Sequence, residues 1–119
     1  MSCEIKLTRS FQRAAKRLAK KHRSLGSDLK LLIEVLKLDP YAGVLIRPNV
    51  YKLRMAISSK GKGKSGGARV ITYVVANEKT TTDDARVTVN LITIYDKATV
   101  ATLSDRTLDE LVASFLDEE

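Results

Sequence analysis

The sequence predicts a single α+β domain in the order β-α-α-β-β-β-α, built on a central and mostly antiparallel sheet. Three observations carry this prediction. The chain has 119 residues, 44% of them hydrophobic, which suits one core at the common size of a single domain. Segments with apolar side chains at every second position are interspersed with segments in which they recur every three or four residues. The stretches rich in Val, Ile, Thr and Tyr lie in the second half of the chain.

The first half of the chain predicts one strand followed by two helices. Residues 3–8 alternate apolar and polar side chains, as a half-buried strand does. From Ser10, which suits the N-cap, apolar side chains recur on one helical face toward Gly26, which suits the C-terminal cap region. A second helix is expected from residues 27–28 until Pro40 stops it.

The second half predicts three strands and a final helix. Residues 50–57 alternate again, which indicates a strand with a basic outer face. Residues 68–76 and 87–95 are rich in β-branched and aromatic side chains, and the polar residues 77–85 are expected to join them as a hairpin. Ser104 can cap a last helix, whose apolar stripe packs on the core or covers a site on the sheet.

Charge is distributed unevenly along the chain. Residues 104–119 contain six acidic side chains against one basic one, a balance of −5, so residues 1–103 carry +12. A basic field of this size attracts polyanions by counterion release. The composition therefore implies that the partner is nucleic acid, an acidic protein, or both.

Several classes of protein are excluded by what the sequence lacks. No apolar run approaches the roughly 20 residues needed to cross a bilayer, and the basic residues come with no bulky aromatic face, so no membrane partner is expected. Cys3 is the only cysteine and cannot form an internal disulfide, which makes the cytoplasm the simplest location. His22 is the only histidine, is surrounded by basic residues and is predicted on a solvated helix face. We therefore expect no metal site, no cofactor and no histidine-based hydrolase.

A Lys/Gly-rich segment, residues 58–67, is predicted to be a mobile loop between two strands. It resembles the end of a nucleotide-binding loop, but Ser58 stands where that pattern needs glycine, and a strand follows where a helix is required. Lys60, Lys62 and Lys64 alternate with glycines, and no acidic residue lies among them. This pattern favours a cationic loop that contacts a phosphate backbone, with a merely solvated loop as the alternative.

Basic and phenolic side chains at strand positions form the remaining candidate site: Lys52, Arg54, Arg69, Tyr95 and Lys97. Because the ends of neighbouring strands in a meander lie side by side, these residues could share one concave face. Taken singly, each is also explained as an exposed sheet cation or a core tyrosine.

The pattern as a whole resembles the RelE/ParE toxin superfamily over roughly residues 4–116. The resemblance is carried by Tyr-Lys-Leu-Arg-Met at 51–55 and by Gly-Gly-Ala-Arg-Val-Ile-Thr-Tyr at 66–73. The Lys/Gly segment, Leu-Ile-Thr-Ile-Tyr-Asp-Lys at 91–97 and Ser-Asp at 104–105 are more similar to the HigB-like branch. Such a resemblance implies a RelE-like fold.

The implied function is that of a toxin in a type II toxin–antitoxin pair, which cuts mRNA on the ribosome and is silenced by its cognate antitoxin protein. The family's catalytic cations correspond to Lys52, Arg54, Arg69 and Lys97. RelE has a catalytic tyrosine beyond the last cation, and residues 100–103 contain none. Either Tyr95 serves, or the mechanism needs no tyrosine. The loop lysines Lys60, Lys62 and Lys64 would hold the RNA.

The implied chemistry is attack by a ribose 2′-hydroxyl on the adjacent phosphate, leaving a 2′,3′-cyclic end. Arg54 and Arg69 suit charge stabilisation, because arginine cannot act as a base at neutral pH. Lys52 or Lys97 could transfer protons, and Asp96 is the alternative base. The other functions that this resemblance leaves open are ParE-like inhibition of DNA gyrase and a non-catalytic role in antitoxin binding and operator co-repression.

Overall fold

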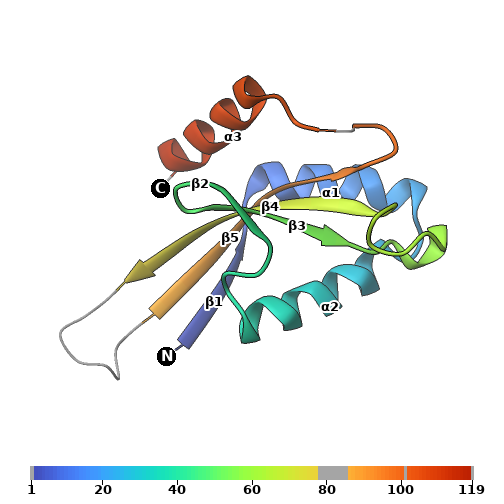
Figure 1. The fold of residues 1–119 in the computed structure, drawn as a ribbon, viewed down its shortest axis with the longest axis horizontal. Helices are drawn as coiled ribbons and strands as arrows, with labels where there is room; N and C mark the ends of the chain where they lie inside the picture. Colours follow the sequence, from blue (N-terminus) through green and yellow to red (C-terminus); the bar gives the residue numbers. More distant parts are fainter. Residues whose placement is uncertain (1, 78–85, 101, 119) are drawn as a thin grey trace.

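The computed structural model describes residues 2–77, 86–100 and 102–118, which form one mixed five-stranded sheet and three helices (Figure 1). The strands are β1 (Ser2–Leu7), β2 (Val44–Arg47), β3 (Val50–Met55), β4 (Ala68–Asn77) and β5 (Arg86–Asp96). The helices are α1 (Arg9–Lys21), α2 (Leu25–Leu38) and α3 (Asp105–Glu118), and a 3₁₀ turn, η1, spans Ser58–Lys60.

The sheet order is β1-β5-β4-β3-β2. β1 runs parallel to β5, and the other three pairs are antiparallel. The predicted α+β class is therefore confirmed. Of the hairpin connection expected at residues 77–85, all but Asn77 lies outside the described residues. None of the described helices is long and apolar enough to cross a membrane.

Three predicted helix boundaries are wrong: the start of the first helix, its end near Gly26, and the start of the second helix. α1 is capped by Thr8, whose Oγ1 accepts the Phe11 amide at 3.2 Å and donates to the Leu91 carbonyl at 2.8 Å, so Ser10 lies inside the helix. Gly26 also lies within a helix, because α2 begins at Leu25 rather than at residues 27–28. The apolar side chain of Leu25 is completely buried, and this burial starts the helix earlier than the polar residues suggest.

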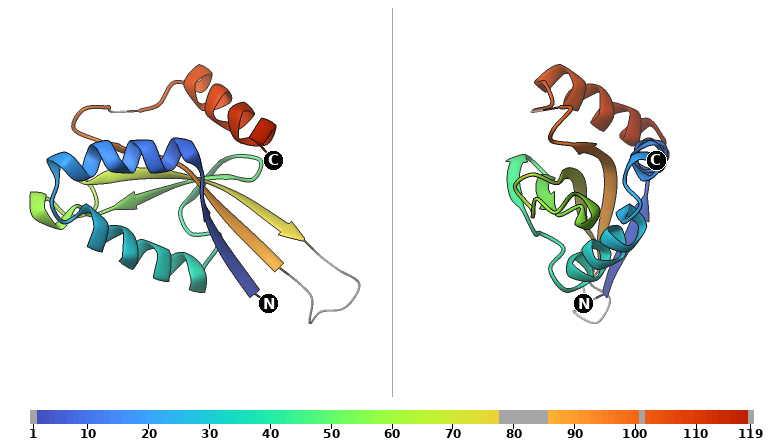
Figure 2. Two further views of the ribbon diagram at one scale, coloured as in Figure 1. Left: turned by 180° about the vertical axis from the view of Figure 1, so that it is seen from behind. Right: turned by 90° about the vertical axis from the view of Figure 1, so that its right-hand side faces the viewer.

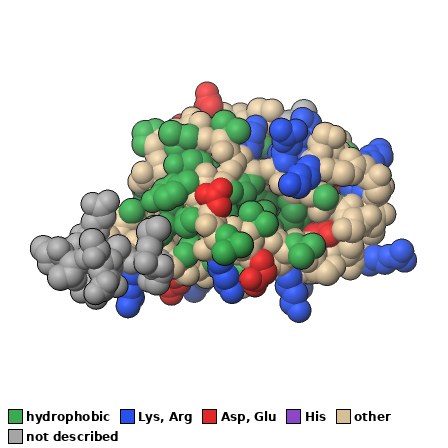
Figure 3. All heavy atoms as spheres, turned by 60° about the horizontal axis from the view of Figure 1, so that its bottom comes forward, with side chains coloured by type: hydrophobic (Ala, Val, Ile, Leu, Met, Phe, Trp, Pro, Cys, Tyr) green, Lys and Arg blue, Asp and Glu red, His purple; other side chains and the backbone are tan. Residues whose placement is uncertain are grey.

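The strand β2 was not predicted, and it changes the element order to β-α-α-β-β-β-β-α. It is an edge strand whose Val44, Leu45 and Ile46 are all exposed, so it lacks the alternation of a half-buried strand. The outward side of α2 exposes Leu31, Val35 and Leu38 as well. Hydrophobic side chains gather accordingly on the surface that carries α2 (Figure 3).

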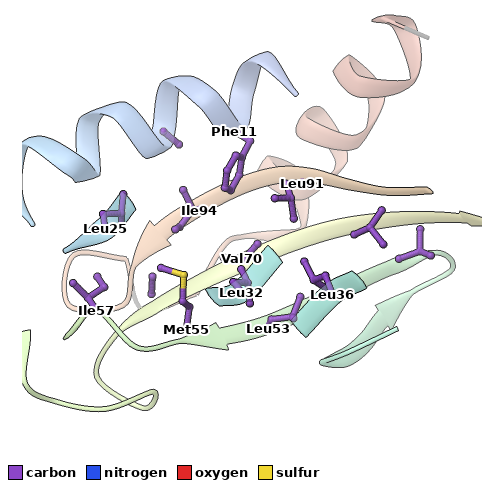
Figure 4. Packing of buried hydrophobic residues seen from close by; sticks show 14 of the residues in the cluster. Phe11, Leu25, Leu32, Leu36, Leu53, Met55, Ile57, Val70, Leu91 and Ile94 are labelled. Atoms are coloured by element: carbon purple, nitrogen blue, oxygen red, sulfur yellow. The ribbon is translucent and has the colours of Figure 1, made fainter. Parts of the chain in front are cut away.

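The sheet has a core on each face. α1 and α2 cover one face, where their side chains pack against those of β3, β4 and β5 (Figures 2 and 4). This core contains Phe11, Leu25, Leu32, Leu36, Leu53, Met55, Val70, Leu91 and Ile94. On the opposite face, Leu108 and Phe115 of α3 pack with Val50, Ile71, Ile92 and Tyr95. α3 lies toward one end of the sheet, and residues 58–67 lie at the other (Figures 1 and 2).

Candidate functional site

The end of the sheet beside residues 58–67 brings most of the predicted catalytic residues together. Strand register pairs Arg54 of β3 with Arg69 of β4, and Arg69 with Tyr95 of β5. Cross-strand partners lie on the same face of a sheet, here the face opposite α1 and α2. Lys52 lies on that face too, two residues before Arg54. This arrangement is a row of basic and phenolic side chains across three strands.

The cations of this sheet end differ in how accessible they are. Arg54 is exposed, Lys52 is half-buried, and Lys97 is exposed just after β5, where its amide donates to the Gly67 carbonyl at 3.1 Å. Within the described part of the chain, none of these three side chains forms an ion pair. An anion can therefore approach Arg54 without displacing a carboxylate.

Arg69 is buried, with 6% of its surface exposed. Its Nη1 donates to the carbonyls of Lys64 and Ala68, and its Nη2 donates to the carbonyl of Ser65, each at 3.1 Å. The guanidinium thus fastens the C-terminal half of the Lys/Gly loop to β4. In this arrangement Arg69 shapes the neighbouring loop and does not face solvent.

Tyr95 is also buried, at 8% exposed, in the cluster with Leu108 and Phe115 of α3. Burial raises the pKa of its phenol, and the charge of Arg69 opposes this effect only in part. The backbone of Leu103 also lowers this pKa, although the Tyr95 Oη forms no hydrogen bond of ordinary geometry with the described residues. Tyr95 is therefore a neutral phenol in an apolar cluster, closed to a stacking base.

Asp96 lies on the other face of the sheet and is 6% exposed. Several polar groups donate hydrogen bonds to its carboxylate. Lys60 Nζ donates to its Oδ1 at 2.8 Å, and the Ala98 amide donates to the same oxygen at 2.9 Å. His22 Nε2 lies 3.1 Å from Oδ2, and since a carboxylate can only accept, this nitrogen carries the proton. The prediction that His22 lies on a solvated helix face is wrong, because its side chain is 16% exposed.

These contacts decide the protonation of Asp96. Burial raises its pKa, but the hydrogen bonds from Lys60, Ala98 and His22 outweigh burial and hold the pKa below its usual range. A carboxylate so stabilised accepts protons poorly, which argues against Asp96 as the general base. Lys60 is correspondingly engaged by an acidic residue from a distant part of the chain, although none lies among the loop lysines in the sequence.

The first half of the Lys/Gly loop is fixed to α2. The amide and hydroxyl of Ser58 both donate to Asp28, with 2.9 Å from the amide nitrogen to Oδ2. Ser24 Oγ donates to the same Oδ2 at 2.7 Å and accepts the Ser59 amide at 2.9 Å. Burial raises the pKa of Asp28, but the hydrogen bonds from Ser58 and Ser24 more than offset it and hold the pKa low.

The loop is therefore tied at both ends instead of being the freely mobile segment that its glycines predict. Gly61 and Gly63 adopt positive φ angles of 69° and 64° between the anchors, a conformation for which glycine is suited. Lys62 and Lys64 are exposed. Of the three predicted RNA-binding lysines, these two present their charge to solvent.

Two residues that support the loop were missed as site residues: Asp28, which binds Ser58 directly, and His22, which binds Asp96, the partner of Lys60. The contact of His22 with Asp96 spans 74 positions, and nothing in the neighbouring sequence signals it. Asp28 lies four residues after Ser24, a spacing that places both on one helix face, but the pair reads as an ordinary helix start.

A hollow of about 560 Å³ lies next to the sheet end, between α2 and β3. Leu31 and Val35 of α2 line one side of it, and Arg54 and Lys64 contribute to its lining as well. β2 is the last strand of the sheet, so its outer edge has no neighbouring strand in the described chain. The exposed apolar side chains of α2 and β2, together with this hollow, are called the apolar face below.

No protein-family model, curated protein or solved structure matches this chain. Across residues 2–77, 86–100 and 102–118, no group of three or more His, Cys, Asp or Glu is placed to hold a metal ion.

Proposed function

We propose that the protein is a ribosome-dependent mRNA endoribonuclease, the toxin of a type II toxin–antitoxin pair. The observation that carries the proposal is the basic sheet end, where exposed Arg54 lies in register with Arg69 and on the same face as Lys52. Exposed Lys62 and Lys64 lie on the adjoining loop. A cluster of cations without acidic partners suits a phosphodiester substrate and the extra charge that develops on it during cleavage.

The chemistry follows from the groups available. The ribose 2′-hydroxyl loses its proton and attacks the adjacent phosphorus, the bond from phosphorus to the 5′-oxygen breaks, and that oxygen takes up a proton. Arg54 stabilises the charge on the phosphorane, and Lys52 and Lys97 are the proton-transfer candidates. Arg69 acts as a positioning residue, because its bonds to the loop carbonyls hold Lys64 at the hollow that Arg54 also lines.

The apolar face supports the partner that this function requires, an antitoxin protein. A partner segment with apolar side chains can pack on Leu31 and Val35 and add a strand to the open edge of β2. Arg54 and Lys64 border the same hollow, so the fitting segment is acidic. A segment bound there would cover Arg54 and thereby silence cleavage.

A second candidate function is a non-catalytic member that binds its antitoxin and assists operator repression. The burial of Arg69 and Tyr95 favours it, since two of the five predicted catalytic side chains do not reach solvent. ParE-like inhibition of gyrase is the third candidate, and the same experiment tests it.

Primer extension on translated mRNA, run beside a DNA supercoiling assay, separates the three. The nuclease predicts new 5′ ends within translated codons only, and Arg54→Ala should lower the cleavage rate about 100-fold or more because it removes a charge-stabilising donor. Lys30→Ala, which removes an exposed cation elsewhere, is the matched control and should cleave normally. Loss of supercoiling without new ends would indicate gyrase, and neither effect would indicate the binding protein.

A further inference from the structure

The helix α1 holds a second concentration of positive charge, separate from the sheet end. Six of its 13 residues are Lys or Arg, none is acidic, and Arg23 follows just after the helix. Outside residues 9–23 the chain has 14 basic and 14 acidic residues, so the formal net charge of +7 equals the charge of this one segment. The protein's excess charge is therefore local.

The six cations of α1 share one side of the helix. Phe11 and Ala14 are buried against the core, and all six cations are exposed. Within the described part of the chain, none of them forms an ion pair. Arg9, Arg13 and Lys20 follow one another along the helix, so the cations form a ridge about 16 Å long at 1.5 Å per residue.

The C-terminal part of the ridge borders a hollow of about 440 Å³, which Arg17, Lys20 and Lys21 line together with Thr99 and Val100. Asp96 is the acidic residue in this lining. Asp96 is almost completely buried and already accepts hydrogen bonds from Lys60 and the Ala98 amide, so its charge does not repel an anion in the hollow. The hollow gives the ridge a concave margin in which a phosphate can be contacted from two sides.

The chemistry of the ridge selects among polyanions. Its exposed apolar side chain is Ala19, too small to insert into a lipid surface. Its aromatic residue, Phe11, is buried, so the ridge offers no stacking platform for unpaired bases. A duplex carries about one phosphate charge per 1.7 Å of its axis, so a ridge of about 16 Å faces several phosphates at once.

We propose that α1 binds the phosphate backbone of duplex RNA, independently of sequence. The inference rests on the proposed function, since an enzyme that acts on ribosome-bound mRNA meets the duplexes of ribosomal RNA. α1 covers the sheet face opposite Arg54. The molecule can therefore hold structured RNA on one side while the single strand reaches the sheet end on the other.

Fluorescence anisotropy with an RNA duplex of about 20 base pairs tests this at several salt concentrations. The triple variant Lys16→Gln, Arg17→Gln, Lys20→Gln should bind about 10- to 100-fold more weakly, with the slope of log K against log salt reduced by about 2. The matched control is Lys6→Gln, Lys30→Gln, Arg86→Gln, which removes the same charge from exposed positions off α1 and should stay within about threefold of wild type. All the substituted residues are exposed, so both triple variants should have the same melting temperature as the wild type.

Two results would overturn the inference: an α1 variant that binds like the wild type, or a control that weakens as much as the α1 variant. mRNA cleavage, measured on the same proteins, judges the proposed function separately. A wild-type protein whose duplex binding depends on α1 but which leaves translated mRNA uncut rejects the nuclease and keeps the α1 inference. If the protein cleaves translated mRNA but its duplex binding does not depend on α1, the nuclease proposal stands and the α1 inference is rejected.

Discussion

The helix α1 and the Lys/Gly loop are the two most basic segments of the chain, and the structure uses their charge in different ways. Every cation of α1 is exposed, and none pairs with an acid within the described residues. In the loop, Lys60 is paired with Asp96, and the backbone is held by Asp28 at one end and Arg69 at the other. Net charge along the sequence therefore does not tell how much charge is free to bind a partner.

The difference has a physical origin. An amphipathic helix satisfies its own backbone hydrogen bonds, so the outward positions of α1 need no partner from the protein. A glycine-rich connection between β3 and β4 has no such internal ladder, and the amides of Ser58 and Ser59 and the carbonyls of Lys64 and Ser65 find side-chain partners instead. The loop is thus a built structure whose cations are only partly available.

The largest effect should come from the anchor at the loop's C-terminal half. Arg69→Ala leaves three carbonyls without their charged donor and removes a buried side chain, and we expect a loss of about 2–4 kcal/mol in the free energy of unfolding. Arg13→Ala on α1 removes an exposed arginine and should change the free energy of unfolding by less than about 0.5 kcal/mol. Urea unfolding measures both. Equal effects of the two substitutions would abolish the distinction between an engaged and a free cation.

Asp96→Asn should have the next largest effect. Asparagine can still accept the Ala98 amide, but it removes the charge that pairs with Lys60 and faces His22, so we expect a loss of about 1–3 kcal/mol at pH 7. Asp39→Asn, at an exposed carboxylate, is the control. A variant as stable as this control would show that Asp96 does not hold the loop.

The same substitution has a defined pH dependence. The pKa of Asp96 is lowered in the folded protein, so below the ordinary aspartate value of about 3.9 the native state binds fewer protons than the unfolded chain. The stability that Asp96 contributes is therefore present above that pH and is lost as pH falls through the lowered pKa. The gap between wild type and Asp96→Asn should narrow as unfolding is measured from pH 7 toward pH 3, and parallel curves would contradict this.

Much of the fold follows from local periodicity, while the site depends on distant contacts. The strands containing Arg54, Arg69 and Tyr95 are readable from alternation and composition, and their adjacency follows from a simple meander. The burial of Arg69 cannot be predicted from alternation or composition, because it depends on how the loop folds back over β4. β2 was not predicted because both of its sides are exposed. The contact of His22 with Asp96 was not predicted because Asp96 lies on β5, in the other half of the chain.

The smallest predicted effect tests whether the loop is held in one conformation. Gly61 has a φ of 69°, and a Cβ there would meet nothing within 4 Å, so Gly61→Ala carries only the backbone cost of about 1 kcal/mol. Gly26 also has open space around it but lies inside α2, so Gly26→Ala should stabilise the protein by about 0.5–1 kcal/mol. Thermal melting distinguishes the opposite signs. If Gly61→Ala were neutral or stabilising, the loop would not require its left-handed turn at Gly61, and its backbone would not be held in one conformation between the two anchors.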